Sequence, residues 1–199
     1  MKNKEITKKI ISGKFKNKSL KIPSKTTTRS SKAIVLESFF NTIQFEIIDA
    51  TFVELFSGSG SIGLEALSRG AKHVLFMERD RDAIKILKEN IQQTDPALCE
   101  IYSGDTFINI QSVVKTLQRK SEKAYFYIDP PFNIREGMED IYDKTIDLIA
   151  SLPKECVKLI IIEHMSGLEI PDTIGPFYII KSKKFGNTTL TYFKSKDIE

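Results

Sequence analysis

The sequence of 199 residues has few cysteines and no long apolar segment. Its two cysteines, Cys99 and Cys156, stand alone, with no CxxC pair and no histidine paired to them. This pattern argues against a zinc site and a disulfide framework, so we expect no metal and a reducing, cytoplasmic environment. No apolar run approaches the roughly 18 residues of a membrane span. The N-terminus also lacks the apolar stretch of a secretory signal, so we expect no membrane association.

Charge is unevenly distributed along the chain, although the net value is only +4. Residues 1–32 hold 11 Lys and Arg and one acid, a net charge of +10. Residues 33–199 hold 19 basic and 25 acidic residues, a net charge of −6. A basic N-terminal segment followed by an acidic remainder predicts that the N-terminal segment binds a polyanionic partner.

The spacing of apolar residues predicts one α/β domain with a short N-terminal appendage. Residues 1–31 read as a small basic hairpin, turning near Lys16 and Asn17, followed by a polar linker. Residues 32–199 begin with a helical pattern and then alternate between amphipathic patterns and short apolar runs. Those runs, at residues 52–56, 74–77, 125–128 and 159–162, are typical of parallel strands covered on both faces.

The end of the chain has a different pattern. Residues 177–185 and 189–193 are joined by Gly186 and Asn187 with no helix between them, which predicts an antiparallel hairpin. A mostly parallel, Rossmann-like sheet that ends in such a hairpin is the outline of the class I methyltransferase fold.

A glycine-rich loop follows the first strand of this domain. Gly58, Gly60 and Gly63 fit the pattern GxGxxG, which lets the backbone turn tightly and approach a nucleotide-like ligand. A dinucleotide and S-adenosylmethionine are both candidates, and a loop without a ligand is the structural alternative. Glu54 ends the strand, where a carboxylate suits an ammonium and a sulfonium but repels a pyrophosphate. The loop has no basic residue for a phosphate, so we favour S-adenosylmethionine.

Two further acids follow the next strands. Glu78 is expected to accept the ribose hydroxyls, unless it is a solvated acid before a helix that Asp80 caps. Asp105 is expected near the adenine edge, and it could equally cap the next helix. The predicted cofactor-binding residues are Glu54, Phe56, Ser57, Gly58, Ser59, Gly60, Glu78, Arg79, Asp105 and Thr106.

The segment Asp129-Pro130-Pro131-Phe132 follows an apolar strand and supplies the predicted catalytic residues. Two prolines make a rigid turn that is rich in acceptors, because proline has no backbone N–H. The Asp129 carboxylate and the Pro130 carbonyl can accept both protons of an exocyclic base amine and aim its lone pair at an electrophile. Phe132 offers a face on which an unstacked base can stack.

Together these segments resemble the bacterial small-subunit ribosomal RNA guanine-N2 methyltransferase family of RsmD type. The most diagnostic block is residues 54–71, and the basic stretch from Gly13 to residue 20, residues 129–132 and the Gly186 hairpin extend the likeness over nearly the whole chain. Arg29 with residues 32–41 resembles the Arg-Pro-Thr…Phe-Asn stretch of the family, except that two of its arginines are absent near residues 33–36.

The resemblance implies methylation of the N2 amine of a guanine in 16S rRNA on an assembling small subunit. The expected RNA-binding residues are Lys14, Lys16, Lys18 and Arg29, with surface solubilisation as the alternative for the lysines. We expect a monomer. The remaining alternatives are an adenine-N6 methyltransferase on DNA or RNA, since the same motif serves both amines, and a noncatalytic ribosome-assembly factor. A dehydrogenase ranks last because it has no use for residues 129–132.

Overall fold

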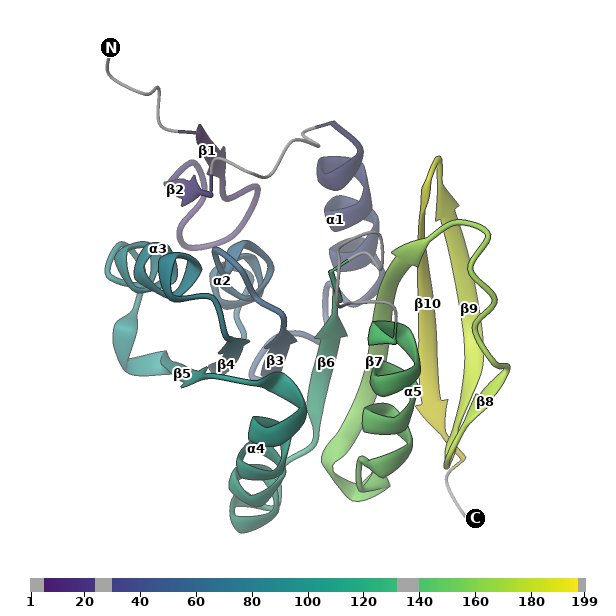
Figure 1. Ribbon diagram of the computed structural model, residues 1–199. Coiled ribbons are helices and arrows are strands. Elements are labelled where there is room, and N and C mark those ends of the chain that lie inside the picture. The colour runs from purple at the N-terminus through teal and green to yellow at the C-terminus, as the bar shows by residue number, and fades with distance from the viewer. Residues whose placement is uncertain (1–5, 24–29, 132–139, 197–199) are drawn as a thin grey trace.

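The computed structural model describes residues 6–23, 30–131 and 140–196. A central sheet lies between two layers of helices, and a small hairpin lies above one end of the sheet (Figure 1). The strands are β1 (Ile6–Lys9), β2 (Ser19–Ile22), β3 (Thr51–Leu55), β4 (His73–Glu78), β5 (Cys99–Ser103), β6 (Ala124–Ile128), β7 (Val157–Met165), β8 (Thr173–Ile174), β9 (Phe177–Phe185) and β10 (Thr188–Ser195). The α-helices are α1 (Ser30–Thr42), α2 (Ser61–Ser68), α3 (Arg81–Ile91), α4 (Thr106–Lys120) and α5 (Ile141–Ser151). Short 3-10 turns cover Pro96–Leu98 and Lys154–Cys156.

The large sheet has the strand order β5-β4-β3-β6-β7-β10-β9-β8. Strands β5, β4, β3, β6 and β7 pair in parallel, as the apolar runs predict, and the others pair antiparallel. The chain proceeds outward from β3 to β5 on one side and from β6 on the other, so the order reverses between β3 and β6. In doubly wound sheets, ligands bind at the carboxyl ends of the strands at this switch point.

Two apolar cores cover the two faces of the sheet. One face packs against α1, α2, α3 and the N-terminal hairpin, with Phe39, Leu64 and Leu87 among its buried residues. The other packs against α4 and α5, with Val113 and Ile149 in its core. Strands β3 and β6 are buried along their whole length, which explains their continuous apolar sequence. Within the described part of the chain, none of the helices combines the length and apolar character needed to cross a bilayer.

The C-terminal hairpin has the predicted form. Strands β9 and β10 pair antiparallel around Gly186, whose φ of 61° lies in the left-handed region, and β10 joins the sheet beside β7. The two-residue strand β8 was not predicted, because it is too short to give a periodic signal.

The N-terminal hairpin also forms, but it differs in its connection. Strands β1 and β2 pair antiparallel from Ile6 opposite Ile22 to Lys9 opposite Ser19, and residues 10–18 form a longer loop than expected. Ile10 and Leu20 belong to the same buried core as α2 and α3. Residues 24–29 of the predicted linker lie outside the described part of the chain, whereas its last two residues, 30 and 31, belong to α1. The division of the chain into two domains at residue 31 stays a prediction.

Candidate active site

A cavity of about 440 Å³ lies at the switch point, between the sheet and the N-terminal hairpin. We call two of its sides the sheet wall and the hairpin wall; Ala33 and Leu36 of α1 and Ser61 and Ile62 of α2 complete its lining. The sheet wall consists of Glu54, Phe56, Ser57, Gly58, Ser59, Tyr127, Asp129 and Glu163. The hairpin wall consists of Ile6, Thr7, Lys8, Lys9, Ile11, Ile22 and Pro23. The volume of the cavity suits a ligand of cofactor size.

Glu54 is one of two buried acids of the sheet wall, with 4% of its surface exposed. The Gly63 amide donates to its Oε2 atom at 2.8 Å. Burial raises the pKa of Glu54 to about 8, although the amides of Gly63 and Ile62 and the charge of Lys8 act in the opposite direction. A cationic ligand would therefore stabilise the ionised carboxylate. Glycine is required at residue 63, since a Cβ there would lie 2.9 Å from Oε2 and 2.5 Å from the Phe76 ring.

The loop after β3 adopts an unusual backbone conformation. Phe56, Gly58 and Gly60 have φ values of 56°, 53° and 75°, all in the left-handed region. For Phe56, a bulky residue, this conformation is rare and is typically found at functional sites. The Ser57 Oγ atom is buried and has no hydrogen-bond partner within the described structure, so the loop offers a polar atom to a ligand.

Glu78 supports this loop from the end of β4. Its Oε2 atom accepts from the Gly58 amide at 2.7 Å, and its Oε1 atom accepts from the amides of Arg79 and Asp80, both at 2.8 Å. Asp80 caps α3 by accepting from the Ala83 amide, as the sequence suggested. Glu78 therefore holds the loop in position, and its contact with a ribose stays a prediction.

Asp105 caps α4, which was one of the two interpretations of this residue. Its Oδ1 atom accepts from the Phe107 amide at 2.8 Å. The preceding Gly104 donates to the Glu78 carbonyl at 2.8 Å, so the ends of β4 and β5 meet. The contact of Asp105 with adenine stays a prediction. The predicted cofactor residues outside the cavity lining are Gly60, Glu78, Arg79, Asp105 and Thr106.

The predicted catalytic turn begins at the sheet wall. Asp129 follows β6 and lines the cavity together with Tyr127. Pro130 is buried and Pro131 is half-buried, so the turn is packed against the protein. Phe132 lies outside the described residues. The sheet thus brings Glu54 and Asp129, which are 75 positions apart in the sequence, to one cavity.

The lysines predicted to bind RNA lie on the loop between β1 and β2, outside the cavity lining. The Lys14 and Lys18 Nζ atoms lie 5.1 and 5.5 Å from the centroid of the Phe15 ring. Lys14 also lies 3.6 Å from an Asp95 carboxylate oxygen, and Lys18 donates to the Gln93 carbonyl. Lys16 is exposed, and Arg29 lies outside the described residues.

Sequence reasoning missed the two lysines nearest the chemistry. Lys8 and Lys9 line the cavity from β1. Both belong to the basic N-terminal segment of residues 1–32, but an irregular stretch of sequence gives no sign of which lysines face a ligand. The structure leaves Lys8 half-buried and Lys9 exposed, and this difference follows from the fold and not from the sequence pattern.

Buried polar side chains, among them Glu65, Ser68 and Asn90, hold the hairpin against the domain, and none was predicted; the Ser68 Oγ atom accepts from the Phe15 amide at 2.9 Å and donates to the Ser12 carbonyl at 2.5 Å. Glu65 of α2, 1% exposed, accepts from the amides of Ile11 and Ser12 at 2.7 and 3.1 Å and pairs with Arg69 at 2.7 Å. Asn90 of α3, fully buried, exchanges hydrogen bonds with the Lys21 backbone and donates to the Ser59 carbonyl at 2.9 Å. The hairpin is therefore fixed to the helices and to the glycine loop.

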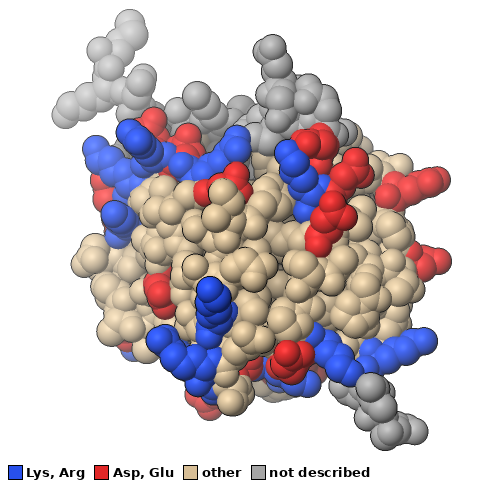
Figure 2. All heavy atoms as spheres, turned by 60° about the horizontal axis from the view of Figure 1, so that its bottom comes forward, with Lys and Arg blue, Asp and Glu red and all other residues tan. Residues whose placement is uncertain are grey.

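Surface charge elsewhere is mixed. Figure 2, with the bottom of Figure 1 turned forward, shows both basic and acidic side chains scattered over that face, with broad areas between them that carry neither. The charge difference between residues 1–32 and 33–199 therefore does not give this face a charge of one sign. Among the described residues, no three or more His, Cys, Asp or Glu side chains group in a way that could hold a metal ion.

The chain is similar in sequence to a known protein family and to named rRNA methyltransferases. Residues 8–194 match a family model described as conserved hypothetical protein 95. The chain is 30% identical over 189 residues to the "Putative rRNA methyltransferase YlbH" of Bacillus subtilis, covering 94% of this chain and 99% of that protein. It is also 30% identical over 142 residues to the "Ribosomal RNA small subunit methyltransferase D" of Escherichia coli, covering 71% of this chain and 66% of that protein.

A solved structure gives the same fold. The "Putative methyltransferase yhhF" of Escherichia coli superposes with a TM-score of 0.75 at 24% identity, covering 96% of this chain and 99% of that chain. The predicted class I S-adenosylmethionine-dependent methyltransferase fold is confirmed.

Proposed function

The chain belongs to the RsmD-type family whose model is described as conserved hypothetical protein 95, and from this premise we propose that it methylates ribosomal RNA with S-adenosylmethionine as its methyl donor. The site of methylation in this proposal is the exocyclic N2 amine of a guanine in 16S rRNA. The enzyme acts as a monomer in the cytoplasm, on an assembling small subunit.

The observation that carries this proposal is the meeting of Glu54 and Asp129 at one cavity. Glu54 is the penultimate residue of β3 and Asp129 directly follows β6, and these two strands flank the switch point. A methyl donor held by one and an amine held by the other would face each other across that point. Direct methyl displacement depends on such alignment more than on a strong base.

The described residues fit the methyl donor. The buried Glu54 carboxylate has a raised pKa and gains from a cation, which the ammonium and sulfonium groups of S-adenosylmethionine provide. The Ser57 Oγ atom is buried without a partner within the described structure. When bound, the cofactor supplies an electrophilic methyl group. Glu54 and the loop of residues 57–60 would hold its methionine end, with Glu78 on the ribose and Asp105 near the adenine.

The proline-flanked turn would hold the base. Asp129 and the Pro130 carbonyl accept hydrogen bonds from the target amine and direct its lone pair toward the methyl donor. Pro131 keeps the turn rigid, and Phe132 stacks on the unstacked base. The lysines of the N-terminal hairpin bind the phosphates around it, which explains why basic residues concentrate before the catalytic sheet.

Mass mapping of small-subunit rRNA from cells with and without this gene tests the proposal. We expect one N2-methylguanosine to disappear in the deletion strain and to return when the wild-type gene is restored. The same measurement also tests the alternative functions. Loss of N6-methyladenosine with intact N2-methylguanosine would show that the target base is adenine and not guanine. An unchanged modification pattern, together with absence of S-adenosylmethionine binding by calorimetry, would indicate a noncatalytic assembly factor.

A further inference from the structure

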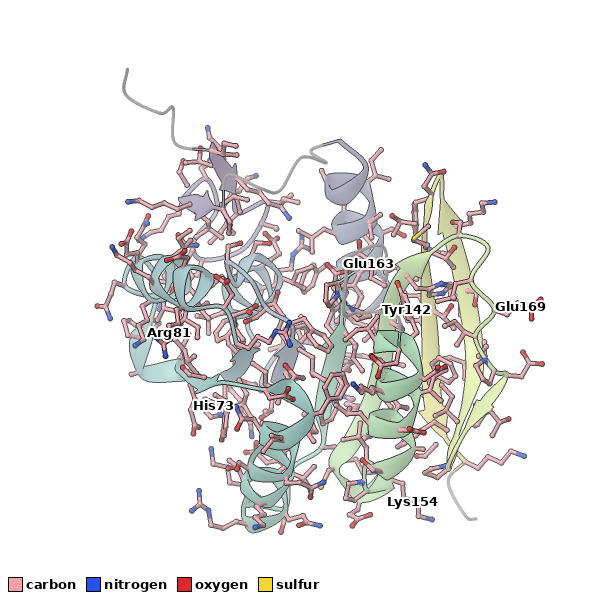
Figure 3. All side chains as sticks on the ribbon, in the orientation of Figure 1. His73, Arg81, Tyr142, Lys154, Glu163 and Glu169 are labelled. Carbon is pink, nitrogen blue, oxygen red and sulfur yellow. The ribbon has the colours of Figure 1, made fainter. Side chains whose placement is uncertain are left out.

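The third carboxylate of the sheet wall, besides Glu54 and Asp129, has no part in the function proposed above. Glu163 lies near the end of β7 with 3% of its surface exposed and lines the cavity. Figure 3 labels it beside α1, at the upper ends of β6 and β7. A buried acid facing a ligand cavity is costly to fold unless donors surround it, so its position calls for an account of what it binds.

The register of the sheet places Glu163 beside the catalytic turn. Ile128 of β6 pairs with Ile162 of β7, so Asp129 and Glu163 follow on neighbouring parallel strands. Both line the same cavity. A base whose amine is held by Asp129 would present the adjacent part of its edge on the side of Glu163.

Glu163 is held as a hydrogen-bond acceptor by the tyrosine beneath it. The Tyr127 hydroxyl donates to Glu163 Oε2 at 2.6 Å. Burial, together with the nearby Glu163 carboxylate, holds the pKa of Tyr127 well above its usual range, so the phenol keeps its proton. A carboxylate can accept about four hydrogen bonds, so it can receive a further N–H while it keeps the bond from Tyr127.

Guanine and adenine present opposite chemistry at this position. Beside its N2 amine, guanine has the N1–H donor. Beside its N6 amine, adenine has the N1 lone pair, which a carboxylate repels. We infer that Glu163 accepts the N1–H of the target guanine and thereby selects guanine over adenine. This inference rests on the proposed function and adds the residue that decides its substrate.

Replacing guanine by 2-aminopurine tests the inference, because 2-aminopurine keeps the N2 amine and has a lone pair at N1. The probe is a reconstituted small subunit whose 16S rRNA carries a synthetic segment with either base at the mapped position. Wild-type enzyme should methylate guanine faster than 2-aminopurine by on the order of 100-fold, the value of a hydrogen bond to a charged group. Glu163→Gln should lower the rate on guanine by a similar factor, yet leave or raise the rate on 2-aminopurine, since the amide N–H can donate to N1.

Tyr127→Phe is the matched control. It removes the hydroxyl that orients Glu163 but keeps the carboxylate, so it should slow methylation while the preference for guanine persists. The cofactor affinity and circular dichroism of both variants should resemble those of wild type. Equal losses on guanine and 2-aminopurine in Glu163→Gln would overturn the inference and assign Glu163 a structural role. Failure of the wild-type enzyme to form N2-methylguanosine at all would instead refute the proposed function.

Discussion

The two walls of the cavity are built in contrasting ways. The sheet wall presents the carboxylates Glu54, Asp129 and Glu163 from the ends of neighbouring parallel strands, where backbone ladders fix their positions. The hairpin wall presents Lys8 and Lys9 from a two-stranded unit outside the large sheet. The hairpin depends on side chains of α2 and α3 for its position.

The two walls differ in charge and in rigidity, and this difference suits them to two tasks, methyl transfer and the binding of a polyanion. Methyl transfer requires reacting atoms held to a fraction of an ångström, which suits residues at the ends of packed strands. Capture of a polyanion requires positive charge near the surface, and its energetics depend on charge number more than on exact geometry. Removing single groups from each wall should therefore produce effects of different kind and size.

The largest effect is expected from Asp129→Ala on the sheet wall. Methyl transfer should fall by on the order of a thousandfold, because the target amine loses the acceptor that positions it. Cofactor affinity, measured by calorimetry, should stay within about tenfold of wild type, since Asp129 is assigned to the base. The exposed acid Asp143 of α5 offers a matched control, and Asp143→Ala should retain wild-type activity. Full activity in Asp129→Ala would refute the assigned role.

Attachment of the hairpin wall should depend on Glu65. Glu65→Ala leaves two amides and Arg69 without their buried acceptor, so the free energy of unfolding should fall by about 3 kcal/mol in urea denaturation. Methylation should fall as well, at temperatures where the variant is still folded. Lys144→Ala breaks an exposed pair with Asp140 and should leave the unfolding midpoint unchanged. Equal stabilities of the two variants would show that Glu65 does not anchor the hairpin.

Measurements of stability and cofactor affinity over a range of pH should detect the ionisation of Glu54. Since the pKa of Glu54 is raised from 4.5 to about 8, folding favours its protonated form, and the cofactor-free protein should lose stability as the pH rises through about 8. Cofactor binding needs the ionised form, so affinity should increase with pH, by at most about tenfold per pH unit, up to the same point. Calorimetry in buffers of different ionisation enthalpy would detect the released proton. Glu54→Gln should bind weakly with no such dependence; an unaltered pH profile would contradict this account.

The smallest effect is expected from the lysines of the hairpin loop. Replacing Lys14, Lys16 and Lys18 by Ala should weaken RNA binding and reduce the slope of log affinity against log salt by about 2 to 3, one phosphate contact for each lysine. Cofactor affinity should not change. Replacing Lys115, Lys120 and Lys123, which are exposed on and after α4, makes the same change in charge far along the chain. Equal salt slopes for the two triple variants would indicate that charge alone, and not the hairpin, governs binding.

Much of the sheet wall could be predicted from local sequence. Glu54 lies within an apolar run, the glycine loop and the segment beginning at Asp129 each follow one, and the ends of parallel strands necessarily meet at one edge. The contribution of Glu163 could not be predicted in this way. It lies inside a longer strand than the apolar run at residues 159–162 indicates, and only the pairing of β6 with β7 brings it beside Asp129.

For the hairpin wall, the sequence predicts the element but not which of its side chains line the cavity. Charge and periodicity are local properties of the chain, so they suffice to predict that a basic hairpin precedes a doubly wound α/β domain. Which lysines line the cavity and which lie outside its lining follows from the packing of the hairpin on the domain. That choice depends on Glu65 and Asn90, two buried polar residues that satisfy backbone groups more than fifty positions away in the sequence. Such pairings carry no periodic signal, since each is one contact between distant segments.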